Sequence, residues 1–208
     1  MKILSFDSSA TSASVCLFDT NESKVIGEFY INTKLTHSQT LIPMLDSLIS
    51  SADININDID CFAVNTGPGS FTGIRIGVSA VKGLAQPLDK KCVTVSTLEV
   101  IAKPLENTGC YAVSVMDARC NQVYTAQFNC LNGFERVTED EAITIDELAE
   151  KLKTVTQPVV LIGDGTNVTY KKLKDVLPNV TIAPLSVRYQ SAANVALIAA
   201  EKLENDDY

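Results

Sequence analysis

The chain of 208 residues has few of the side chains that build histidine metal centres, and it lacks long apolar runs. It contains one histidine, His37, and no tryptophan. A catalytic metal held by several histidines is therefore excluded. No apolar run approaches the roughly 18 residues that a membrane helix needs. The carboxylate of Asp7 also comes too early for a signal peptide. We expect a cytoplasmic protein with no membrane association.

The cysteines do not form the close pairs that bind zinc or carry out redox catalysis. There are six, none in a CxxC arrangement. Most lie in apolar runs of strand length, which predicts buried, reduced thiols. The six are Cys16, Cys61, Cys92, Cys110, Cys120 and Cys130.

Positive charge is also scarce. The formal net charge is -8, and lysine and arginine form no cluster. An acidic surface repels a nucleic-acid backbone instead of releasing its counterions. If the protein serves an RNA substrate, another subunit must hold the RNA.

The most distinctive stretch runs from Asn65 to Gly77. The apolar run before it predicts a strand, and Gly67, Pro68 and Gly69 predict an irregular turn. Apolar residues then recur at helical spacing, and Ser70 or Thr72 is placed to cap the helix. Two interpretations stay open. The turn either offers N–H groups to an anion, or its glycines allow helices and a sheet to pack closely. It matches neither the Walker motif nor the dinucleotide fingerprint.

This stretch resembles the signature of the TsaB (YeaZ) family. The signature positions are Gly67, Pro68, Gly69, Ser70, Phe71, Thr72, Gly73 and Arg75. Further similarity covers 3–17, 36–51, 117–119 and 123–124. The resemblance implies the non-catalytic partner subunit of the bacterial machinery that makes N6-threonylcarbamoyladenosine (t6A) in tRNA. It also implies the actin, Hsp70 and sugar-kinase (ASKHA) fold.

An internal duplication agrees with that fold. A strand, a turn at Asp7 and a return strand open the chain, and the same order recurs around Asp117. We therefore expect an α/β protein with two lobes of mixed sheet. Residues 1–104 are expected to form the first lobe, with the dimerisation helices, and 105–208 the smaller second lobe. The C-terminal helix could instead pack back on the first lobe.

In the ASKHA superfold the first turn faces the phosphates and metal of ATP. The resemblance therefore suggests weak binding of ATP or ADP and no other cofactor. The alternative is an ordinary polar turn. The candidate residues are Asp7, Ser9, Gly67, Gly69, Gly163 and Gly165.

The segment Ser96-Thr97-Leu98-Glu99 predicts a helix that starts with a capping box. In the similar TsaD and Kae1 family, the matching helix carries two histidines four residues apart that hold a metal. Those positions are Thr97 and Ile101 here, and neither side chain replaces an imidazole ligand. The resemblance thus implies no catalytic residue, no metal and no enzyme activity.

Two helices, near 36–51 and 74–85, have wide apolar faces. Such faces usually pack in a core, but in the family these helices form the dimerisation surface. The implied partners are a TsaD-like catalytic subunit in a heterodimer, a TsaE-like ATPase, and a second copy when the chain is alone; tRNA is reached only through the complex. The implied interface residues are His37, Leu41, Met44, Leu45, Leu48, Ile74, Val78 and Val81.

Two other functions are weighed against this scaffold. A small-molecule kinase needs a base and a carboxylate for Mg²⁺, and Asp7, Asp117 and Asp164 are the candidates. A peptidase needs a histidine base, for which only His37 is available.

Overall fold

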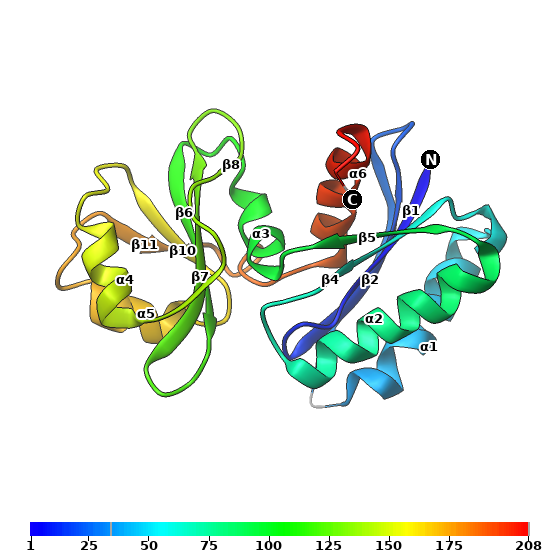
Figure 1. The fold of residues 1–208 in the computed structure, drawn as a ribbon, viewed down its shortest axis with the longest axis horizontal. Helices are drawn as coiled ribbons and strands as arrows, with labels where there is room; N and C mark the ends of the chain where they lie inside the picture. The colour runs from blue at the N-terminus through cyan, green and yellow to red at the C-terminus, as the bar shows by residue number, and fades with distance from the viewer. Residues whose placement is uncertain (34, 208) are drawn as a thin grey trace. The chain divides into compact units, whose positions relative to one another are not determined.

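The computed structural model describes residues 1–33 and 35–207. The chain divides into two compact units (Figure 1). The first unit comprises Met1–Val100 and the C-terminal stretch that begins at Ser191, and the second unit comprises Ile101–Gln190. The division lies four residues before the expected boundary at 104. The C-terminal helix belongs to the first unit, not to the second lobe over 105–208.

The first unit contains a five-stranded mixed sheet of order β3-β2-β1-β4-β5. Strands β1, β2 and β3 form an antiparallel meander, and β4 and β5 add in parallel to β1. Strands β1 and β4 are almost wholly buried, as expected of strands covered on both faces. The bounds are Lys2–Asp7, Ser12–Asp19, Lys24–Asn32, Cys61–Asn65 and Lys91–Val95.

Helices cover both faces of this sheet (Figure 1). Helices α1 (His37–Ala52) and α2 (Phe71–Ala85) pack on one face. Helix α6 (Ala192–Glu204) packs on the other face. Short 3-10 turns lie at Ile56–Asp58 and Gln86–Leu88.

Hydrogen bonds explain why the C-terminal helix belongs to the first unit. Ser191 caps α6 by accepting the N–H of Ala193. The Ser5 hydroxyl donates to the Ala192 carbonyl at 2.6 Å, and the Ala192 N–H donates to the Ser14 hydroxyl at 2.8 Å. The start of α6 is therefore held by both β1 and β2.

The second unit repeats the arrangement. Its sheet has the order β11-β10-β6-β7-β8, and β9 also pairs with β7. The strands are Cys110–Asp117 (β6), Gln122–Cys130 (β7), Glu135–Arg136 (β8), Glu141–Thr144 (β9), Val159–Ile162 (β10) and Val180–Ile182 (β11). Helices α4 (Ile145–Leu152) and α5 (Thr166–Leu173) belong to this unit, and the unit boundary falls within α3 (Thr97–Ala102), which precedes the turn Lys103–Leu105. Because both sheets place an antiparallel pair beside two parallel strands in the same chain order, the predicted duplication is confirmed.

Two helices of the second unit begin differently. Thr144 and Glu147 form a capping box at the start of α4. Gly165 occupies the N-cap position of α5. Among residues 1–33 and 35–207, no helix is both long and apolar enough to cross a membrane.

All six cysteines are free thiols, and four are buried. The expectation of buried thiols is wrong for Cys92 and Cys120, which are exposed. Cys92 lies on β5, the edge strand of its sheet, and Cys120 lies in the turn between β6 and β7.

Candidate partner interface and nucleotide site

The signature glycines lie against the turn that follows β1. A Cβ atom at Gly69 would clash with the Ser9 carbonyl, and one at Gly73 would clash with the Ser8 carbonyl. A Cβ at Gly77 would lie 2.5 Å from the Ser8 hydroxyl. These glycines therefore let α2 approach the turn more closely than any other residue would, as the close-packing interpretation predicts.

Hydrogen bonds fix this contact. The Ser70 N–H donates to the Ser9 carbonyl at 2.6 Å, and the Ser8 hydroxyl donates to the Gly73 carbonyl at 2.9 Å. Ser70, and not Thr72, caps α2 by accepting the Gly73 N–H at 3.2 Å. The N–H groups of Ser70 and Gly73 therefore donate to oxygen atoms of the protein itself. The anion interpretation needed these two groups to be free for a ligand.

The apolar stripe of α1 faces the core of the first unit. Leu41, Met44, Leu45 and Leu48 are buried among the residues of β1, β2 and β4, and so is Val81 of α2. Their assignment to a partner interface stays a prediction. A helix that covers a sheet buries its widest apolar face on that sheet, so these side chains contribute mainly to the core. Leu41 also lines the groove described below.

The other three predicted interface residues are partly accessible. Ile74 and Val78 are half-buried on α2, and Val78 also packs on the core. His37 is half-buried, and its Nε2 lies 2.7 Å from the Ala10 carbonyl. The imidazole that a peptidase would need as a base is engaged with the backbone.

A groove follows the outward side of the two helices. Its volume is about 480 Å³, and it contains two exposed apolar side chains, Ile42 at 43% and Phe71 at 68%. The Arg75 guanidinium lies 3.8 Å from the centre of the Phe71 ring. The groove is lined by His37, Ser38, Leu41, Ile42, Phe71, Thr72, Arg75, Ile76, Ser79 and Ala80.

Sequence reasoning missed Ile42, Ile76 and Ala80 as groove residues. The sequence did contain a signal for Ile42. This residue lies outside the apolar stripe of α1, on a side of the helix that does not face the core. A second hollow of about 230 Å³ shares part of the groove lining. It is rich in hydroxyls, which come from Thr11, Thr33, Thr36, Ser70 and Thr72.

The nucleotide candidates of the first unit surround Asp7. Its Oδ1 accepts the N–H and the hydroxyl of Ser9, both at 2.9 Å. Its Oδ2 is buried, near Asn65, with no hydrogen-bond partner of standard geometry among the residues that the structure describes. Burial raises the pKa of Asp7, and the hydrogen bond from the Ser9 backbone opposes this shift. Gly67 accepts the Thr97 N–H at 2.7 Å. Polar atoms of Asn65 and Thr97 are also buried without partners.

The remaining candidates, Gly163 and Gly165, lie in the second unit. A Cβ at Gly163 would clash with the Val115 carbonyl, which also accepts the Gly165 N–H at 3.0 Å. Partial shielding from water raises the pKa of Asp164, although its side chain lies at the surface of the unit; the Asp117 carboxylate also raises it. Glycines again bring a turn against the end of a strand.

Hydrogen bonds between carboxylates and backbone N–H groups hold the turn at Asp117. The Asp117 side chain accepts the Arg119 N–H at 2.8 Å, and the Asp117 N–H donates to the Asp164 carboxylate at 3.2 Å. Asp117 therefore has a structural part in the turn.

Two positions of helix α3 bear on the question of a metal site. Thr97 and Ile101, the positions of the histidine pair in the TsaD and Kae1 family, are both buried. Within the described ranges, no group of three or more histidine, cysteine, aspartate or glutamate side chains is arranged to hold a metal ion.

Two units of the same strand order define an actin-like or sugar-kinase-like protein. A ROK hexokinase from Thermus thermophilus has this fold, with a TM-score of 0.58 and 11% identity over 98% of this chain and all of that chain. The predicted fold class is confirmed.

Closer relatives identify the family. A family model described as TsaD, tRNA N6-adenosine threonylcarbamoyltransferase, matches residues 24–206. The tRNA threonylcarbamoyladenosine biosynthesis protein TsaB of Bacillus subtilis is 34% identical over 85% of this chain and 77% of its own length. TsaB of Escherichia coli is 31% identical over 79% of this chain and 72% of its own length. YeaZ from Pseudomonas aeruginosa has a TM-score of 0.83 at 22% identity, over 99% of this chain and 93% of that chain. The chain belongs to the TsaB (YeaZ) family.

Proposed function

We propose that this protein is a non-catalytic subunit of the machinery that makes t6A in tRNA. It binds the TsaD catalytic subunit and allows that subunit to act together with a TsaE-like ATPase. The names of the TsaB relatives and the TsaD family model support a part in t6A biosynthesis. The observation that carries the scaffold role is the groove on α1 and α2, with Ile42 and Phe71 exposed.

The chemistry of the groove suits a helical partner. Exposed apolar side chains in a groove between two helices are typical of surfaces that receive the apolar face of another helix. Phe71 is the best candidate for an anchor, because aromatic side chains dominate binding energy at interfaces. Arg75 lies against its ring and keeps a charge at the rim. Ser79 and Ala80 are small and would let a partner helix approach α2 closely.

The side chains at two positions of α3 support the non-catalytic role. The resemblance to the TsaD and Kae1 family places the two histidines at Thr97 and Ile101, and both of these side chains are buried here. The net charge of -8 supports contact with tRNA only through the complex. We expect a second copy to occupy the same groove when the chain is alone.

Pull-down with the TsaD subunit tests this interface. We expect Ile42→Asp and Phe71→Glu each to weaken binding at least about 100-fold, since a charge would be buried in an apolar contact. Both variants should stay folded by circular dichroism, and Phe71→Glu should be monomeric. Reconstituted tRNA modification should also fail with both variants.

The matched control is Val176→Asp, which changes an exposed valine of the second unit. It should bind as the unchanged protein does. Normal binding by both groove variants would reject the interface, and t6A formation without this chain would reject the function.

A kinase is the second candidate, and the observation in its favour is the buried Asp7 with one unpartnered oxygen. Calorimetry with Mg-ATP separates the two functions. Micromolar binding that Asp7→Asn removes would favour the kinase. Absence of heat would favour the scaffold.

A further inference from the structure

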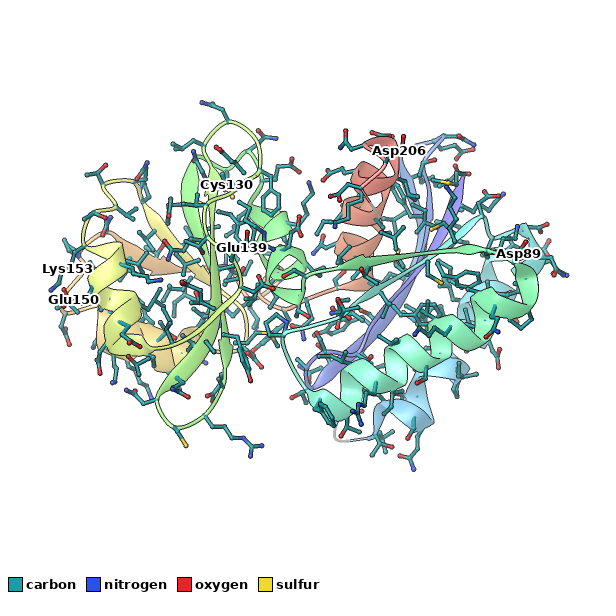
Figure 2. All side chains as sticks on the ribbon, viewed as in Figure 1. Asp89, Cys130, Glu139, Glu150, Lys153 and Asp206 are labelled. Carbon is teal, nitrogen blue, oxygen red and sulfur yellow. The ribbon has the colours of Figure 1, made fainter. Side chains whose placement is uncertain are left out.

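Two buried cysteines lie opposite each other in the second unit. Cys110 is the first residue of β6, Cys130 is the last residue of β7, and the two are directly paired in the antiparallel ladder. Figure 2 labels Cys130 near this end of the hairpin. Opposite residues of such a pair have Cβ atoms about 4.5–5.5 Å apart. A disulfide needs about 3.5–4.5 Å, so a small approach of the two strands is sufficient.

The two sulfur atoms already interact. A hydrogen bond with Cys130 lowers the pKa of the Cys110 thiol. The same hydrogen bond and burial raise the pKa of Cys130. The Thr108 hydroxyl lies 3.3 Å from the Cys110 sulfur. Cys110 is 5% exposed and Cys130 is 0% exposed, and Cys110 has the Thr108 hydroxyl beside it, so Cys110 is the sulfur placed to react first.

No other described cysteine has a cysteine opposite it. Cys16 faces Ser5 and Glu28 across its ladders, and burial raises the pKa of its thiol to about 12. Burial likewise raises the pKa of Cys61 to about 12. These buried thiols should be inert, because the thiolate is the reactive form.

We infer that Cys110 and Cys130 are a redox pair, which a small hydroperoxide converts into a reversible disulfide that closes the open end of the β6–β7 hairpin. With hydrogen peroxide, the Cys110 thiolate attacks one oxygen and breaks the O–O bond. Cys110 becomes a sulfenic acid, and the leaving hydroxide takes a proton to form water.

The second step uses Cys130. Its sulfur attacks the sulfur of the sulfenic acid and breaks the S–O bond. The hydroxide that leaves takes the Cys130 proton, which gives a second water. The peroxide gains two electrons, and the two thiols lose them. Cys110 is only 5% exposed, so a small oxidant suits this pair better than a bulky disulfide.

The test uses the full chain with Cys92→Ser and Cys120→Ser, which removes the two exposed thiols. After treatment with hydrogen peroxide, we expect the intact mass to fall by two hydrogen atoms. Peptide mapping should link Cys110 to Cys130, and dithiothreitol should restore the mass. The oxidised form should melt roughly 5–10 °C higher than the reduced form, because the bond restricts the unfolded chain.

Two variants in that background assign the roles. Cys130→Ser should let a sulfenic acid accumulate on Cys110, which a cyclic diketone probe traps once the oxidised protein is unfolded in its presence. Cys110→Ser should show neither trapping nor loss of mass. An unchanged mass in the parent at peroxide concentrations that label Cys110 in Cys130→Ser would overturn the proposal. A disulfide between any other two cysteines would do the same.

Discussion

The two units have the same strand order but carry helices of very different length. Helices α1 and α2 contain 16 and 15 residues, whereas α4 and α5, which follow the corresponding strands, contain eight each. The longer pair covers its sheet and still presents a groove with exposed Ile42 and Phe71. The duplicated fold therefore needs only short helices to cover a sheet, and the added turns of the first unit form the surface on which we propose that a partner binds.

The outward face of α4 is charged instead. Lys151 pairs with Glu141 at 2.6 Å, and Lys153 pairs with Glu150 at 2.6 Å. Both pairs are well exposed, and such pairs stabilise a fold very little. The charges of these side chains favour exposure of this face to water (Figure 2). The first unit, in contrast, combines a covered sheet with the groove that contains Ile42 and Phe71.

The largest expected effect separates the two sides of α1. Leu45→Asp would bury an unpaired charge in the core and should lower the free energy of unfolding by about 4 kcal/mol or more. Ile42→Asp, three residues earlier on the outward side, should cost less than about 1 kcal/mol. Urea unfolding of both variants measures the difference. Equal losses would show that the groove is part of the core.

This contrast shows what the sequence could not decide. The spacing of Leu41, Leu45 and Leu48 predicted the helix correctly, because an amphipathic pattern needs only local periodicity. The same pattern arises whether the stripe covers a sheet or a partner. Which one applies depends on β1, β2 and β4, which pack on α1 only in the folded chain.

The glycines were ambiguous for a similar reason. An anion site and a close packing contact both require the absence of a Cβ atom. Only the position of the Ser8 and Ser9 carbonyls, far away in sequence, shows that Gly69 and Gly73 serve packing. The fold class, in contrast, was predictable because the strand–turn–strand pattern occurs twice.

An intermediate effect tests this close packing within one helix. Gly73→Ala should destabilise the first unit by about 1–3 kcal/mol, since the new methyl group meets the Ser8 carbonyl. Gly83 of the same helix has nothing within 4 Å of a Cβ, so Gly83→Ala should stabilise by about 0.5–1 kcal/mol. Thermal unfolding gives both values. A neutral Gly73→Ala would show that α2 can move away from the turn.

Gly163→Ala extends the test to the second unit. Its φ of +115° and the Val115 carbonyl both oppose a side chain. A loss similar to that of Gly73→Ala would show that both copies of the fold depend on the same device.

The smallest expected effect concerns buried carboxylates and pH. The pKa of Asp7 is raised above its ordinary value of 3.8, chiefly by burial. A folded state with a raised carboxyl pKa binds more protons than the unfolded state, so ionisation opposes folding as the pH rises above 3.8 and through the folded pKa. Asp7→Asn keeps an oxygen that can accept from Ser9, and it removes this penalty. It should therefore raise the melting temperature at pH 7, and the gain should vanish below pH 3.8.

Asp164→Asn is the matched variant in the second unit. The pKa of Asp164 is raised by partial shielding and by Asp117, but its side chain reaches the surface. Because water solvates its charge better, its gain at neutral pH should be smaller than that of Asp7→Asn. Melting curves of both variants between pH 3 and pH 8 measure the difference. A larger gain from Asp164→Asn would show that the charge of Asp164 destabilises the fold more than the charge of Asp7 does.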